Sequence, residues 1–308
     1  MDRALAIALN TFREAVRDRV LYGVLGFAVA VLGFTLALAE LSMQEQRRVV
    51  LDVGLASISL FSVIIAVFLG SSLLYKEIDR KTLYVILPKP VRRYELLVGK
   101  FLGITLTAVV FIGVMGAVQL FVTAIQAGAP SWVLILAPVA LTIVLGITFY
   151  RASDRTSLAP AMSAIALTTM TGVCATTDAA VLPILEALAL VVGEVILLAS
   201  VAMLFGSFST PFLTGAFTIG VWLLGRSADS MASMHSRVLP EALRTFLHGL
   251  AWVVPNFNLF VPSMHALDET VGALAPGAYV GQSLAYAVLY ASALLVVASA
   301  LFERRDLA

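Results

Sequence analysis

The amino-acid sequence predicts an all-α protein, a polytopic membrane helical bundle of about eight transmembrane helices. Hydrophobic residues make up 60% of its 308 residues and only 13% are charged, and the mean hydropathy is +0.99. These values are far from those of soluble globular domains. Long apolar runs recur along the chain, and a helix needs roughly 20 such residues to cross about 30 Å of hydrocarbon. We therefore expect one transmembrane domain over residues 1–308.

The N-terminal leader, residues 1–19, is predicted to form an amphipathic helix at the membrane interface. Its apolar residues at helical spacing are Leu5, Leu9, Phe12 and Val16. Charged residues occupy other positions of the same helix. The leader is too long and too acidic for a signal peptide, and the apolar run that follows is longer than a signal core. We expect that run, residues 20–39, to be retained as the first span.

The remaining spans are predicted from seven further apolar runs. Five are long, at residues 53–75, 98–125, 132–150, 183–205 and 280–302. The other two are weaker, because residues 158–175 include Thr and Ser and residues 208–225 are few for a full crossing.

Lys and Arg residues set the expected orientation, because cytoplasmic loops close to the spans carry an excess of them. With eight spans, 15 of the 20 Lys and Arg residues fall on the side that holds both termini. The five on the other side are Arg47, Arg48, Arg226, Arg237 and Arg244. This asymmetry favours cytoplasmic termini.

A charged segment, residues 76–97, separates two of the long apolar runs. It is too charged to enter lipid and too short to form a domain, so we expect a cytoplasmic helix and turn that dock on a soluble partner. An apolar stripe within the segment ends at Pro88 and Pro90. The expected contact residues are Glu77, Lys81, Thr82, Leu83, Ile86, Leu87, Arg92 and Arg93. The alternative is that the basic residues only anchor the loop to anionic lipid, at about 1 kcal/mol each.

Glu194 lies near the middle of an apolar run, where a charge costs a few kcal/mol, so it should face the bundle interior. Glu186 lies eight residues earlier on nearly the same helix face. Glu194, Glu186 and Gln119 are the candidate residues of a translocation path. Two interpretations of Glu194 stay open. The acid contacts cargo or protons on a translocation path, or it is a structural group hydrogen-bonded to a neighbour such as Gln119 or a Thr.

Residues 226–279 form the longest polar stretch, which the predicted topology places outside the cell. Helical spacing indicates an amphipathic helix from about Leu239 to Val254, with Pro240 near its start and Pro255–Asn256 at its end. This helix either enters the outer leaflet or covers the bundle as a lid.

Several other chemistries find little support. The single cysteine, Cys174, excludes an intrachain disulfide. Residues 220–227 imitate P-loop spacing, but Arg226 replaces the phosphate-binding Lys and the segment lies in an apolar run. Residues 231–265 contain side chains that could bind copper as soft ligands, namely Met231, Met234, His235, Met264 and His265. These show no tight repeat, so we predict no metal site.

Three segments carry a family resemblance. They are the leader from Asn10 to Arg19, the charged segment from Glu77 to Lys100, and the tail from Phe302 to Leu307, with Pro255–Asn256 as a weaker fourth. In these segments the chain resembles an ABC-2-type permease, the membrane subunit of an ATP-binding-cassette exporter. Within that family it is most similar to the NosY-like permeases of multicopper-enzyme maturation.

The resemblance implies a division of labour. Two permease copies would form the path as a homodimer, and separate cytoplasmic ATPase subunits, which hold the ATP and Mg, would drive it through residues 76–97. This chain would then need no cofactor and catalyse no reaction. The resemblance also implies export across a bacterial inner membrane. Such permeases usually have six spans, so residues 131–175 would be an inserted hairpin.

A secondary, ion-coupled transporter that uses Glu194 is the alternative function. Such a transporter should show an inverted repeat of spans or several buried charges, and the sequence shows neither. The cargo stays open among lipid, peptide, drug and polysaccharide precursor.

Overall fold

The computed structural model describes most of the chain. The described residues are 2–42, 45–79, 93–151, 156–177, 181–229, 245, 249, 253–261 and 275–303. Within them all regular structure is helical and no strand occurs. The predicted all-α bundle is therefore confirmed.

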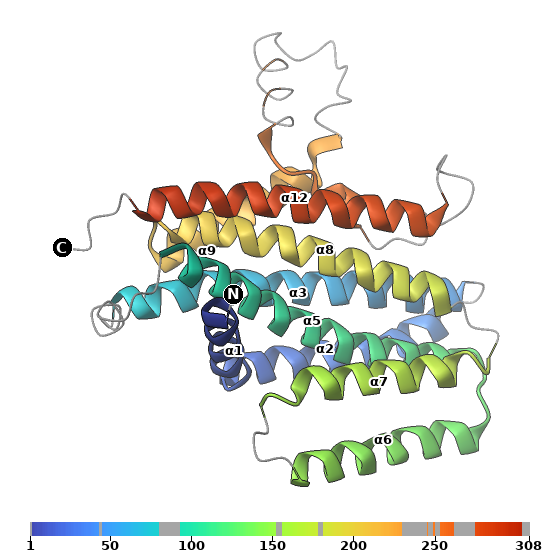
Figure 1. Cartoon of the computed structure of the whole chain (residues 1–308). Coiled ribbons are helices and arrows are strands. Elements are labelled where there is room, and N and C mark those ends of the chain that lie inside the picture. Colours follow the sequence, from blue (N-terminus) through green and yellow to red (C-terminus); the bar gives the residue numbers. More distant parts are fainter. Residues whose placement is uncertain are drawn as a thin grey trace.

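The long helices lie side by side as one bundle, and α1 crosses them at a steep angle (Figure 1). Their order is α1 (Asp2–Val16), α2 (Arg19–Leu41), α3 (Gln46–Asp79), α5 (Arg93–Gln126), α6 (Ser131–Arg151), α7 (Ala159–Cys174), α8 (Val181–Gly206), α9 (Pro211–Arg226), the 3₁₀ helix η1 (Phe257–Phe260) and α12 (Pro276–Glu303).

Six helices in the described part of the chain are long and apolar enough to cross a membrane, namely α2, α3, α5, α6, α8 and α12. The two weaker predicted spans also form helices, but α7 and α9 have only 16 residues each. At 1.5 Å per residue, each is about 24 Å long, short of a typical hydrocarbon core.

The helices alternate in direction. The C-terminal ends of α3, α8 and α12 lie at the same end of the bundle as the N-terminal ends of α5 and α9 (Figure 1). The charged segment that we expect to contact an ATPase starts at this end, where α3 finishes. Residues 80–92 lie outside the described residues.

Helix α8 forms the centre of the bundle and packs against α3, α5, α9 and α12. Apart from Glu186, Glu194 and Ser200 its residues are apolar, as expected for a helix that is largely enclosed. Gly70 of α3 lets the backbones of α3 and α8 approach closely, because a Cβ there would lie 2.5 Å from the Cβ of Ala202.

Helix α1 is amphipathic as predicted, but its buried face differs from the predicted stripe. Phe12 is fully buried, whereas Leu5 and Leu9 are 59% and 36% exposed. The rest of the buried face consists of small residues: Ala8, Thr11 and Ala15. Two glycines of α5 allow α1 to pack closely. A Cβ on Gly103 would come within 2.8 Å of Ala8 and Thr11, and one on Gly99 would come as close to Ala4 and Ile7. The leucines face outward, where a membrane interface would accept them.

Candidate functional site

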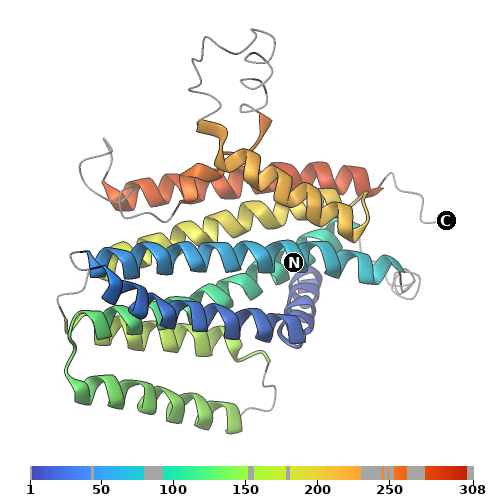
Figure 2. The same ribbon diagram turned by 180° about the vertical axis from the view of Figure 1, so that it is seen from behind.

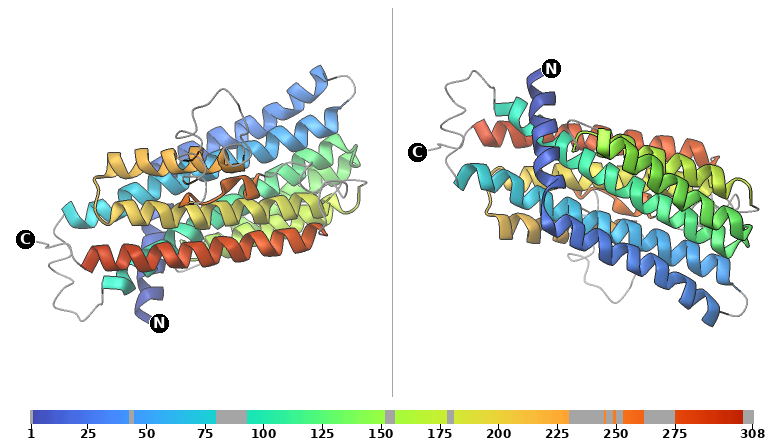
Figure 3. Two further views of the ribbon diagram at one scale, coloured as in Figure 1. Left: turned by 90° about the horizontal axis from the view of Figure 1, so that it is seen from above. Right: turned by 90° about the horizontal axis from the view of Figure 1, so that it is seen from below.

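Helix α9 runs beside only part of the bundle (Figures 2 and 3). It starts near the C-terminal end of α8 and ends at Arg226, whose side chain meets Glu194 near the midpoint of α8. The sequence placed Arg226 in an external loop. The structure instead places it inside the bundle, because α9 stops halfway and η1 packs against both α8 and α9.

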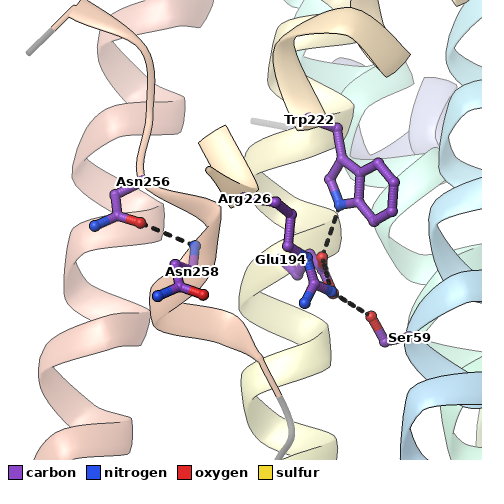
Figure 4. Close-up of polar contacts among 6 residues, drawn as sticks. All are labelled: Ser59, Glu194, Trp222, Arg226, Asn256 and Asn258. Atoms are coloured by element: carbon purple, nitrogen blue, oxygen red, sulfur yellow. Dashed lines mark hydrogen bonds and ion pairs between the residues drawn. The ribbon is translucent and has the colours of Figure 1, made fainter. Parts of the chain in front are cut away.

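Four side chains from three helices form a hydrogen-bonded network at this depth (Figure 4). The Oε1 atom of Glu194 accepts hydrogen bonds from Trp222 Nε1 at 2.8 Å and from Arg226 Nη2 at 2.9 Å. Its Oε2 atom accepts a hydrogen bond from Ser59 Oγ at 2.7 Å. Arg226 Nη2 also lies 3.0 Å from Ser59 Oγ, and its guanidinium carbon lies 5.3 Å from the centre of the Trp222 ring. We call these four residues the central network.

The central network compensates a charge that would otherwise be costly. Glu194 is fully buried, while the side chain of Arg226 is 24% exposed. A buried carboxylate without a partner costs several kcal/mol, and here it has one cation and two neutral donors. The ion pair therefore fixes the end of α9 against α8 and α3.

A pocket of about 570 Å³ opens beside the central network. Its lining residues are Asp52, Ala56, Ser59 and Leu60 of α3, Trp222, Leu223 and Arg226 of α9, and Val261. Such a volume, with mostly apolar walls and a few polar groups, is typical of small-molecule sites. Two side-chain atoms of these residues, Asp52 Oδ1 and Arg226 Nε, are buried and have no hydrogen-bond partner within the described part of the chain.

The chain just after α9 is held by a second polar cluster. The carboxylate of Asp229 accepts hydrogen bonds from the side-chain amides of Asn256 and Asn258, both at 2.7 Å. The backbone N–H of Asn258 donates to the side-chain oxygen of Asn256 at 2.9 Å (Figure 4). This hydrogen bond fixes the side-chain amide of Asn256. We call Asp229, Asn256 and Asn258 the α9 anchor.

Three tyrosines of α12 hold the segment that carries the two asparagines. The hydroxyls of Tyr279 and Tyr290 donate to the carbonyls of Leu259 and Val253, at 2.8 and 2.7 Å. The hydroxyl of Tyr286 accepts a hydrogen bond from the backbone N–H of Asn256 at 3.1 Å. The α9 anchor therefore connects the end of α9 to α12.

Glycines make this close packing possible. A Cβ on Gly225 would collide with the carbonyl oxygen of Pro255, and one on Gly193 would lie 2.6 Å from the ring of Phe260. Residues 255–260 therefore approach the backbones of both α9 and α8.

Replacing Asp229 with Ala is expected to loosen the end of α9. Two charge-assisted hydrogen bonds would be lost, and because the cluster is exposed we expect about 2 kcal/mol in total. The measurement is thermal unfolding in detergent. Glu45→Ala is the control, since it removes an exposed acid paired only with Arg48 in the described structure. Equal melting temperatures for the two variants would contradict the anchoring role.

Glu186, proposed from the sequence, does not join the central network. It is partly buried, and its Oε1 atom lies 3.7 Å from the position that a Cβ on Gly277 of α12 would occupy. Helix α8 thus directs Glu194 toward α3 and α9, and Glu186 toward α12.

Gln119 also lies elsewhere. Its Nε2 atom donates to the carbonyl of Val50 at 3.0 Å, and its side chain packs against Gly54, so it connects α5 to α3. Gln119, one of the neighbours considered for Glu194, is therefore not its hydrogen-bond partner. The hydroxyl partner is Ser59 rather than a Thr.

The predicted docking residues are mostly outside the described residues. Glu77 belongs to the last turn of α3, and Arg93 is the first residue of α5. The six that fall in the undescribed stretch are Lys81, Thr82, Leu83, Ile86, Leu87 and Arg92. The same holds for the Met and His residues considered as copper ligands and for most of the helix predicted near Leu239–Val254.

Sequence reasoning missed Arg226 and Trp222 as partners of Glu194. The sequence did contain a signal for Arg226. It lies at the end of one apolar run, and a basic residue there is a natural partner for an acid deep in another run, such as Glu194. No such signal was available for Asp229, since its partners lie 27 and 29 positions away. Among the described residues, no group of three or more His, Cys, Asp or Glu side chains is placed to hold a metal ion.

A bundle of apolar helices with a charged network at mid-depth defines a polytopic integral membrane protein. The sequence matches the family described as ABC-2 family transporter protein over residues 5–307. The chain therefore belongs to the ABC-2 transporter family and is the permease subunit of an ABC transporter. Membrane subunits of this family are not catalytic themselves, and membership implies a separate ATP-binding partner subunit. No curated protein matches the chain.

Proposed function

We propose that this permease forms the translocation path of an ABC exporter of the NosY-like group. In this proposal it works as a homodimer with two cytoplasmic ATPase subunits, in a bacterial inner membrane, with both termini in the cytoplasm. The supporting observation is the Glu194–Arg226 ion pair at mid-depth beside a pocket of about 570 Å³. Paired charges inside a membrane bundle typically mark a substrate path.

Helix α3 offers a route for coupling ATP hydrolysis to this pocket. It is one continuous helix of 34 residues with Glu77 near one end and Ser59 at the central network. The 18 positions between them correspond to about 27 Å of helix. A tilt of α3 driven at its cytoplasmic end would therefore shift Ser59 relative to Glu194 and change the shape of the pocket.

The pocket favours cargo that is mainly apolar and carries a polar group. Trp222, Leu223 and Leu60 supply apolar area, while Asp52, Ser59 and Arg226 are the polar residues of the wall. The ion-coupled alternative receives less support, because a coupling carboxylate must exchange its ion, whereas Glu194 is held by Arg226 and two further donors.

Purification of the tagged chain from its native membranes tests the proposal. We expect an ATP-binding subunit to copurify at a one-to-one ratio, and the complex to hydrolyse ATP. Mass spectrometry identifies the subunit, and the mass of the intact complex gives the number of permease copies. A chain that purifies alone under conditions that preserve other membrane complexes, and transports without ATP, would contradict the proposal.

A further inference from the structure

The hairpin of α6 and α7 stands apart from the centre of the bundle. In Figures 1 and 2, α6 is the outermost helix, and α7 lies between it and α5. No residue in the membrane-length window of α6 is buried. Much of its apolar surface points outward, since Ile135, Leu136 and Ile143 are all more than half exposed. Side chains of α6 therefore do not fill the space between it and α5.

That space is an apolar groove of about 430 Å³ between α5, α6 and α7. Its lining residues are Val110, Val114, Ala117, Val118 and Phe121 of α5, Pro138, Leu141 and Leu145 of α6, and Ala159, Met162, Ser163, Ala166 and Met170 of α7. The one polar side chain, Ser163, donates its hydroxyl to the carbonyl of Pro160 at 2.9 Å. The groove offers water no unpaired side-chain group to bind, so hydrocarbon is its natural content.

The groove has the length and direction of a lipid tail. Along α7 it extends from Ala159 to Met170, which is about 16 Å at 1.5 Å per residue. Half of a typical hydrocarbon core is about 15 Å. The groove follows the helices, as an acyl chain in one leaflet does, and its lining begins at Ala159, the first residue of α7. Helix α7 begins at the end of the bundle where α6 finishes (Figure 1).

The same end carries a residue typical of a membrane interface. Tyr150, the last but one residue of α6, is 86% exposed. Tyrosines are enriched where the apolar core meets the headgroups. We propose that the groove between α5, α6 and α7 binds one acyl chain of a resident phospholipid, with its headgroup at the level of Tyr150. This site does not depend on the proposed translocation path.

The resident lipid is tested by purifying the whole chain in a mild detergent and measuring retained phospholipids by native mass spectrometry. We expect about one tightly held phospholipid per chain. Ala166→Phe should lower this occupancy at least fivefold, because Ala166 is a buried residue of the groove wall. Ala161→Phe is the control, since Ala161 is an exposed residue of the same helix. Equal lipid retention by the two variants would overturn the site.

A second measurement distinguishes a resident lipid from a cargo lipid. Release of the bound lipid when the ATPase partner and ATP are added would also overturn the proposal, because it would identify the lipid as cargo rather than a resident. Retention of detergent alone, with no phospholipid, would do the same.

Discussion

Replacing Arg226 with Leu is expected to destabilise the bundle and abolish the ATP-driven activity of the complex. The substitution leaves the carboxylate of Glu194 fully buried without its cation. Breaking a buried ion pair by removing one partner costs about 3–5 kcal/mol. We therefore expect a clearly lower melting temperature in detergent and a loss of at least tenfold in the ATP hydrolysis of the assembled complex.

Arg48→Leu is the matched control for this substitution. Arg48 also pairs with acids, Glu45 and Asp52, but its side chain is 50% exposed. Exposed pairs contribute about 0–1 kcal/mol, so the control should leave both measurements nearly unchanged. If Arg48→Leu and Arg226→Leu lower the melting temperature and ATP hydrolysis to a similar extent, burial of the ion pair does not determine its contribution.

A double variant separates a structural role of the pair from a role in transport. Glu194→Gln with Arg226→Leu removes both charges and keeps acceptors and donors that can pair with Trp222 and Ser59. Stability should therefore recover. If ATP-driven activity stays lost, the charges act on the translocation path, and if it recovers as well, the pair is structural. The single variant Glu194→Gln should still insert into the membrane and show altered activity.

The spans could be predicted from sequence because apolar length is a direct requirement of the membrane. Six of the eight predicted runs form helices of sufficient length, and the other two form shorter ones. The depth at which α9 ends could not be predicted. An apolar run of 16 residues looks the same whether it crosses or stops midway, and the end of α9 is set by a contact between Arg226 and a residue 32 positions earlier.

Close helix packing was the other feature that hydropathy did not reveal. The predicted apolar stripe of α1 included Leu5 and Leu9, but the small residues of the buried face are Ala8, Thr11 and Ala15. Ala8 and Thr11 face Gly103 of α5, where the missing side chain allows the two backbones to approach. A scale that rewards only large apolar side chains misplaces such a face. Glu194 could be singled out, since its cost in an apolar run is visible in sequence, whereas its partners depended on the fold.

Replacing Leu83 with Asp is expected to uncouple the permease from its ATPase. Leu83 belongs to the predicted apolar stripe, in the chain between α3 and α5, whose described ends lie at the same end of the bundle (Figure 1). A charge introduced into an apolar docking surface would be desolvated without a partner. A loss of only 1.4 kcal/mol weakens binding tenfold, so we expect at least tenfold less copurifying ATPase. Insertion should be unaffected, because the segment stays outside the lipid.

Two further variants distinguish docking from lipid anchoring. Leu83→Met conserves volume and apolar character, so it should copurify with the ATPase as the unaltered chain does. Glu77→Lys adds a positive charge, which would strengthen attachment to anionic lipid but should impair docking on a protein surface matched to Glu77. If Leu83→Asp and Glu77→Lys both copurify with the ATPase and support normal ATP hydrolysis, the docking role of residues 76–97 is wrong. The basic residues would then act as a lipid anchor, and coupling would have to reach α3 by contacts elsewhere at the same end of the bundle.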